Sequence, residues 1–185
     1  MANNNRITRG EASAGKFLVD NLIRFSDGSE QTTAYHQRWL SAYSTATQTN
    51  TGGGTAAMAM TFTNISDSNE ISLVDNSKIT PQHAGEYNIQ FSAQLDKTDA
   101  GEDNVDIWFN VNGTPVPYSN TRVTMPKNDA KMVASWNFIY DFNANDYLQI
   151  MWWSNDVDMR LYAEGTQTNP TRPAIPSVIL TVWEL

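Results

Sequence analysis

The chain of 185 residues contains no cysteine and no apolar run long enough to cross a membrane. The absence of cysteine excludes disulfide bonds and thiolate metal sites, so stability has to come from a packed core or from association with other chains. A membrane-spanning helix needs about 20 mostly apolar residues, so we expect no insertion into a bilayer. The polar start of the chain, Met1 to Asn5, does not resemble a signal peptide, and we expect synthesis in a cytosol.

Basic residues are scarce, with 12 lysines and arginines against 20 acidic residues, and the net charge is −8. The imbalance is uneven, because residues 1–40 carry a net charge of +1 and the remainder carries −9. An acidic body disfavours nucleic acid as the main ligand. A mildly basic N-terminal segment suits docking on an acidic protein surface, whereas the charge of the body is equally well explained by solubility alone.

In many segments of the sequence, apolar and polar residues alternate. A period of two residues is typical of a β-strand with one face buried and one face in water. The clearest run extends from Tyr87 to Leu95, and the longest from Met132 to Phe142. Asn112 and Gly113 predict a tight hairpin turn. Shorter runs predict further strands at 58–62, 71–74, 105–111, 118–125, 147–153, 159–162 and 176–185. About nine or ten strands predict an antiparallel two-sheet sandwich.

The N-terminal third has a different composition. Residues 1–16 are polar and lack periodicity, which is typical of an arm that becomes ordered on a partner. Phe17–Phe25 predicts one strand, whereas Glu30–Tyr43 fits either a short helix or an extended connector. Three consecutive glycines, Gly52–Gly54, predict a flexible loop. The predicted organisation is an anchoring arm with connector at 1–40, a linker or first strand at 41–55, and a β domain at 56–185.

Several phrases of the β domain resemble C1q/TNF-like jelly rolls. Ala84 to Phe91 looks like the family strand that reads Gly-x-Tyr-x-Phe, and 105–113 is similar to the next strand and hairpin. Residues 145–150 fit the start of a strand where the family usually has Gly-Asp, although Asn145 replaces the glycine. The apolar run 178–183 fits the closing strand. The resemblance implies an all-β, antiparallel two-sheet jelly-roll sandwich that forms a homotrimer.

A second resemblance concerns the segment from Ile23 to Ala34, which is similar to a phrase that recurs in tailed-phage fibre and virion proteins. There it often precedes a trimeric head domain. The resemblance implies a phage virion protein, made in the host cytoplasm, whose arm binds the major capsid protein or another virion protein. The arm residues expected to be buried on that partner are Phe17, Leu18, Leu22, Ile23 and Phe25. The alternative is that they pack on the chain's own sandwich.

Motifs that would indicate catalysis are weak. Gly10 to Phe17 nearly spells a phosphate-binding loop, but Phe17 stands where the motif needs Ser or Thr. The two histidines, His36 and His83, have no recognisable nucleophile beside them, and no serine lies in a Gly-x-Ser-x-Gly elbow. We therefore predict a non-enzymatic protein that has no cofactor.

Two groups of residues remain as candidate binding sites. Asp99, Glu102 and Asp103 lie in an acidic segment that offers weak candidate ligands for Ca²⁺, although a solvated acidic loop is the favoured interpretation. Trp152 and Trp153 must face opposite sides of one strand, so one belongs to the core. The other is expected at a subunit interface or, alternatively, on a platform for a host-surface glycan.

Together, the two resemblances imply a capsid decoration protein or head fibre with an N-terminal arm and a trimeric knob. The alternatives are a tail-fibre tip that binds a receptor and a lectin-like carbohydrate-binding module.

Overall fold

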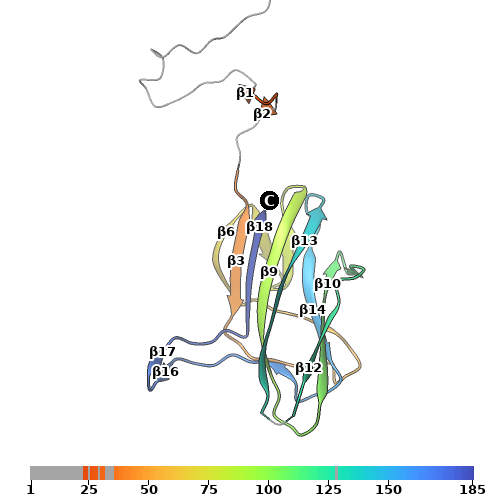
Figure 1. Ribbon diagram of the computed structural model, residues 1–185, viewed down its shortest axis with the longest axis vertical. Coiled ribbons are helices and arrows are strands. Elements are labelled where there is room, and N and C mark those ends of the chain that lie inside the picture. The colour runs from red at the N-terminus through yellow and green to blue at the C-terminus, as the bar shows by residue number, and fades with distance from the viewer. Residues whose placement is uncertain (1–22, 25, 29, 32–35, 128) are drawn as a thin grey trace, which may run out of the picture. The chain divides into compact units, whose positions relative to one another are not determined.

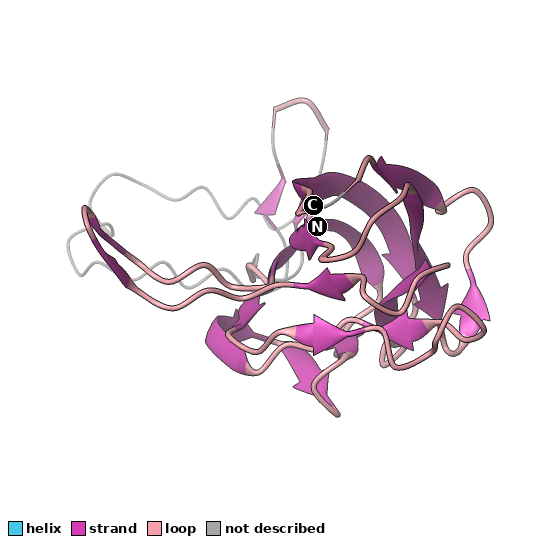
Figure 2. Ribbon diagram, turned by 90° about the horizontal axis from the view of Figure 1, so that it is seen from below, coloured by secondary structure: helices cyan, strands magenta, loops and turns pink. Residues whose placement is uncertain are grey.

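The computed structural model describes residues 23–24, 26–28, 30–31, 36–127 and 129–185. Every regular element in these ranges is a β-strand, as Figure 2 shows by its strand and loop colours. No helix among the described residues is therefore long and apolar enough to cross a membrane. The chain divides into two compact units, residues 1–36 and Gln37–Leu185.

The described part of the first unit is a short hairpin. Strand β1 (Ile23–Arg24) pairs antiparallel with β2 (Glu30–Gln31), with Ile23 opposite Gln31. Of the five predicted anchoring residues, Ile23 lies in this hairpin. The other four, Phe17, Leu18, Leu22 and Phe25, lie outside the described residues.

The second unit contains two antiparallel sheets of seven strands each, which we name after their central strands. In the β9 sheet, β13 (Lys131–Phe142), β9 (Gly85–Asp96), β18 (Val178–Glu184), β3 (Trp39–Ser44) and β6 (Asn64–Asn69) follow one another across the sheet (Figure 1). Two short strands, β15 (Arg160–Leu161) and β4 (Gln48–Thr49), extend it where β9 runs past the start of β18.

The β10 sheet forms the other layer. Its order is β11 (Thr114–Pro115), β10 (Asp103–Val111), β14 (Leu148–Ser154), β8 (Lys78–Pro81) and β7 (Ile71–Val74). In addition, β12 (Thr121–Met125) pairs with β10, and β5 (Met58–Ala59) pairs with β14. A separate hairpin, β16 (Gln167–Thr168) with β17 (Thr171–Arg172), extends from the sandwich in both views (Figures 1 and 2).

The core lies between the two sheets and is formed by alternate residues of their strands. On β9, the buried side chains are Tyr87, Ile89, Phe91, Ala93 and Leu95, as the period of two predicts. They face Val105, Ile107, Phe109, Ile150 and Trp152 of the β10 sheet, which are also buried. Fully burying a side chain of this size stabilises the fold by about 1.5–3 kcal/mol. The predicted all-β sandwich is confirmed.

The start of the sandwich differs from the sequence-based prediction. The compact unit begins at Gln37 rather than at residue 56, because Trp39–Ser44 is a strand that pairs with both β18 and β6. The prediction of a helix or an extended connector for Glu30–Tyr43 is therefore wrong at Glu30–Gln31 and from Trp39 onward, which are strands. Residues 36–38 form no regular element, as expected of a connector. Leu40, Ala42 and Ser44 alternate as buried residues. Two of these three are small, so their alternation was weak in the sequence.

Other boundaries were only partly predicted. Strand β6 was missed because its residues are mostly polar and exposed. In the predicted return strand 118–125, only Thr121–Met125 is a strand, and Tyr118 belongs to the preceding loop. Similarly, only Met58–Ala59 of the predicted segment 58–62 is a strand.

Two turns depend on residues that tolerate positive φ. The hairpin between β10 and β11 has Asn112 at φ 50° and Gly113 at φ 79°, the geometry of a type I′ turn, which confirms the prediction. Asn145 has φ 65°. This is a left-handed conformation that glycine and asparagine both adopt, which explains how Asn145 can stand where C1q/TNF-like sequences have glycine.

Candidate functional site

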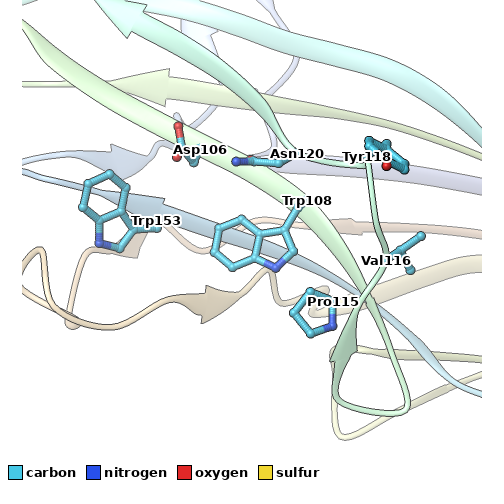
Figure 3. Close-up of a pocket in the computed structure, with 7 residues that line it drawn as sticks. All are labelled: Asp106, Trp108, Pro115, Val116, Tyr118, Asn120 and Trp153. Carbon is cyan, nitrogen blue, oxygen red and sulfur yellow. The ribbon is translucent and has the colours of Figure 1, made fainter.

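A pocket of about 350 Å³ opens on the outward face of the β10 sheet (Figure 3). Val105, Ile107 and Phe109 of β10 point into the core, so Asp106 and Trp108, which alternate with them along the strand, point outward. The loop after β11 closes one side of the pocket. Its lining residues are Asp106, Trp108, Pro115, Val116, Tyr118, Asn120 and Trp153.

The register of three strands places a charged pair beside an indole ring. Asp106 of β10 lies opposite Arg122 of β12 on one side and opposite Trp153 of β14 on the other. Arg122 Nε donates to Asp106 Oδ1 at 2.6 Å, and its Nη2 donates to Oδ2 at 2.8 Å. The hydrogen bonds from Arg122 hold the pKa of Asp106 below its usual value, so the carboxylate is ionised at neutral pH.

Both indoles of the pocket are held by hydrogen bonds through their ring nitrogens. Trp153 Nε1 donates to the carbonyl oxygen of Gly54 at 2.9 Å, and Trp108 Nε1 donates to Asn110 Oδ1 at 2.9 Å. In Figure 3, Trp108 lies between Trp153 and Pro115. Because the ring N–H groups are already engaged, the indoles offer apolar ring surface to the pocket.

The loop that closes the pocket is anchored by a buried serine. Ser119 Oγ accepts a hydrogen bond from the backbone N–H of Phe109 at 3.1 Å and donates to the carbonyl of Val116 at 2.8 Å. The preceding residue, Tyr118, has φ 63° and a fully exposed side chain. A bulky residue with positive φ is rare and costs about 1–3 kcal/mol.

A second surface of interest is the outward face of the β9 sheet, which we call the association face. Its register aligns Ile139 of β13, Asn88 of β9, Trp183 of β18 and Trp39 of β3 in one row. The side chain of Ile139 is 53% exposed. The outward positions in the centre of this face are all uncharged: Trp39, Ser41, Tyr43, Asn88, Gln90, Ser92, Ile179, Thr181 and Trp183.

The association face also contains a buried polar atom that has no hydrogen-bond partner in the part of the chain that the structure describes. The side-chain oxygen of Asn88, Oδ1, is buried and accepts no hydrogen bond from the described residues. Asn88 lies between Ile139 and Trp183 in the register. An unsatisfied buried carbonyl costs roughly 1–3 kcal/mol, so this position carries a cost in stability within the face.

The edge of the sandwich adjacent to this face is lined with aromatic rings. Trp136, Phe138 and Tyr140 of β13 point toward the core but stay partly exposed, because β13 is an edge strand that pairs with β9. The rings contact core residues, with centroids 4.7 Å apart for Trp136 and Phe91 and 4.9 Å apart for Phe138 and Phe109. The edge therefore exposes apolar surface along part of its length.

Among the described residues, the three candidate metal ligands of the acidic segment, Asp99, Glu102 and Asp103, do not come together in one group of carboxylates. Asp103 is buried and contacts the ammonium of Lys97, which also donates to the carbonyl of Gly101 at 2.8 Å. Glu102 is exposed. Only Asp99 of the three candidates joins a cluster of carboxylates, with Asp156 and Asp158 from the loop after β14. Asp99 and Asp156 are half-buried and Asp158 is exposed, and exposed acidic groups are common without a bound ion.

The two consecutive tryptophans lie on opposite sides of β14, as predicted. Trp152 is 1% exposed in the core, and Trp153 lines the pocket. The sequence did not indicate that Asp106, Trp108 and Tyr118 line the same pocket as Trp153, or that Arg122 binds Asp106 there. Two of them could have been identified from the sequence, because Asp106 and Trp108 alternate with the inward-facing residues of the run 105–111.

Comparisons with known proteins support the fold but not a family. No protein-family model matches the sequence, and no curated protein matches it. Among solved structures, the chain is similar to the crystal structure of murine APRIL, with a TM-score of 0.50 and 8% sequence identity, over 81% of this chain and 100% of that one. APRIL is a jelly-roll protein of the TNF family. The chain is thus an all-β protein with a TNF-like jelly-roll fold.

Proposed function

We propose that this protein is a non-enzymatic structural component of a tailed-phage particle. Its N-terminal arm attaches it to the major capsid protein or another virion protein. Its jelly-roll unit projects as a homotrimeric knob. The proposal has two separable parts, the self-association of the knob and its place on a particle.

Self-association is supported by the association face. Interface cores are depleted of charged residues and enriched in aromatic ones, and this face has an uncharged centre that includes Trp39, Tyr43 and Trp183. The aromatic edge of β13 supplies a second apolar surface for a neighbouring copy. The resemblance to C1q/TNF-like jelly rolls favours three copies.

The place on a particle is supported by the resemblance of Ile23–Ala34 to tailed-phage fibre and virion proteins. It is also supported by the division of the chain, since this segment belongs to the unit 1–36, separate from the sandwich. The segment 23–34 ends just before the sandwich begins at Gln37, so little length lies between them for a shaft, which favours capsid decoration or a head fibre over a tail-fibre tip.

The self-association is tested by light scattering of the full-length protein, which should give three times the chain mass of 20.7 kDa. The variant Ile139→Glu places a charge on the association face and should reduce the mass to that of one chain. Val157 is similarly exposed, at 59% against 53% for Ile139, but lies in a loop after β14. Val157→Glu should therefore remain trimeric. A monomeric wild-type protein would refute this part of the proposal.

The place on a particle is tested by counting copies of the protein in purified virions by quantitative protein analysis. A number comparable to that of the major capsid protein supports decoration. A far smaller number supports a fibre or tail component. If the protein is absent from virions, the structural role on a particle is wrong.

A further inference from the structure

The pocket on the β10 sheet is accessible when the association face is covered. The outward faces of two sheets in a sandwich point in opposite directions, so a copy bound to the β9 sheet leaves the β10 sheet exposed. The proposed trimer therefore does not explain why three aromatic residues, Trp108, Tyr118 and Trp153, line this pocket. Aromatic side chains at a pocket that takes no part in the core indicate a ligand.

The aromatic rings are positioned before any ligand arrives. Hydrogen bonds to Gly54 and Asn110 fix the indoles of Trp153 and Trp108. Binding therefore costs little side-chain entropy, which is the advantage of a preorganised site. The face of an indole is electron-rich and attracts the slightly positive hydrogens on the apolar side of a sugar ring.

The conformation of Tyr118 is a second, independent indication that the pocket binds a ligand. Its backbone is strained at φ 63°, and its phenol ring is fully exposed instead of packing on the protein. The anchored neighbour Ser119, which is 5% exposed, maintains this conformation. Strain that contributes nothing to packing points to a functional role for the side chain.

The polar groups of the pocket suit a ligand that has hydroxyl groups and no net charge. Asp106 offers a carboxylate that accepts hydrogen bonds. Asn120 hydrogen-bonds Asp106 through its side chain and keeps a second amide N–H and a carbonyl oxygen for a ligand. Arg122 neutralises Asp106 and is 58% exposed, and its remaining N–H groups can donate to an oxygen of the ligand. Because the Asp106–Arg122 pair has no net charge and the chain carries −8, an anionic ligand is disfavoured.

We propose that this pocket binds a neutral pyranose sugar, which stacks on Trp108 or Trp153 while its hydroxyl groups bond to Asp106, Asn120 and Arg122. The volume of about 350 Å³ lies at the lower end of small-molecule sites and suits one or two sugar rings. A proline-rich peptide also stacks on tryptophan, but it requires a longer groove. This inference goes beyond the proposed function, and it is tested without reference to particles or to the trimer.

The test is isothermal titration calorimetry of the full-length protein with a panel of probes. The neutral probes are the methyl glycosides of glucose, galactose, mannose and N-acetylglucosamine. The competing probes are sialic acid, as an acidic sugar, and a proline-rich decapeptide. We expect at least one neutral glycoside to bind with a dissociation constant on the order of 1 mM, as is usual for a single small ring on a shallow site.

Variants then locate the site. Trp153→Ala, and the milder Trp153→Phe in case the first variant is poorly folded, should weaken binding, the alanine variant by about tenfold or more. Tyr118→Gly removes the ring and relieves the strain, so it should weaken binding while the melting temperature stays the same or rises. Asn145→Gly is the matched control, because Asn145 is also exposed with φ 65° but does not line the pocket. It should bind as the wild type does.

Three results would each overturn the inference. The first is that no neutral glycoside binds to the folded wild-type protein at concentrations of tens of millimolar, well above the expected dissociation constant. The second is that sialic acid or the peptide binds in preference to every neutral glycoside. The third is that Tyr118→Gly and Trp153→Phe both bind the glycoside with wild-type affinity. A protein that is monomeric or absent from virions but binds the glycoside would refute the proposed function and leave this inference intact.

Discussion

Arg122 on β12 donates two hydrogen bonds to the carboxylate of Asp106 on β10, of 2.6 Å and 2.8 Å, and Asp106 lies opposite Trp153 of β14 in the register. The pair joins an edge strand to the strand next to it and keeps the polar floor of the pocket electrically neutral. Arg forms such two-point contacts because its guanidinium is planar and its donors match the spacing of a carboxylate. One interaction thus stabilises the sheet and sets the charge of the candidate site.

Removing Arg122 should affect stability in a pH-dependent way. The pKa of Asp106 is lowered from 3.8, mainly by hydrogen bonds from Arg122. A group with a lowered pKa contributes stability above its unfolded-state pKa and loses it as pH falls through the folded-state pKa. We expect Arg122→Gln to melt at a lower temperature than the wild type at pH 7, and the difference to shrink below pH 3.8. A difference that is unchanged at pH 3 would contradict this account.

The tryptophans should differ in their contribution to stability according to their burial. Trp152 is 1% exposed, and Trp152→Ala should reduce the free energy of unfolding by about 3–5 kcal/mol. Trp136 contacts Phe91 but is partly exposed on the edge strand, so Trp136→Ala should cost less, about 1–3 kcal/mol. Urea denaturation measures both values. Equal losses would mean that an additional contact, such as one with a neighbouring copy, covers Trp136.

Lys97 is fully buried and contacts Asp103 and Asp99, so its removal should be costly. Burial alone would lower the pKa of Lys97, but its hydrogen bonds to Asp103 and Asp99 outweigh that effect and raise it, so the lysine is charged at neutral pH. Lys97→Met leaves the buried Asp103 without its cation and should destabilise the fold by about 3–5 kcal/mol.

The double variant Lys97→Met with Asp103→Leu is the control for this charge pair. It removes both charges and should recover much of the lost stability, because isosteric apolar pairs often replace buried ion pairs at little cost. If the double variant is as unstable as Lys97→Met in chemical denaturation, the loss comes from packing and not from an unpaired carboxylate.

The hairpin turn between β10 and β11 should be sensitive to substitution of its glycine. Gly113 has φ 79°, and an added Cβ would lie 3.6 Å from Tyr147 Oη, an ordinary contact. The cost of Gly113→Ala is therefore a backbone cost, about 1–2 kcal/mol in the free energy of unfolding. Gly165→Ala is the control, since an added Cβ meets nothing within 4 Å and φ is not positive there. A loss in the control of the same size would refute the explanation.

Deleting residues 1–25 should separate attachment from folding. The compact unit Gln37–Leu185 contains both sheets, so the shortened protein should remain folded by circular dichroism. In cosedimentation with particles that lack the protein, it should no longer bind. Binding that survives the deletion would refute the role of the arm.

Much of the sandwich could be predicted from local patterns. Strands such as β9 and β13 alternate over most of their length, because one face of each points to the core and the other to solvent or a neighbour. The type I′ turn at Asn112 and Gly113 was likewise predicted from the two residues that favour it. Strand β3 could not be predicted in this way, because its inward positions include Ala42 and Ser44. Its place in the sheet depends on β18 and β6.

The sequence by itself determined the class of the fold, since the period of apolar residues is a local property. The candidate pocket was decided only by the tertiary structure. Arg122, Asp106 and Trp153 belong to three strands, and register alone brings them into one row. A shift of one residue in any pairing would turn a side chain to the opposite face of the sheet, and the sequence does not encode register separately from the packing of the whole core.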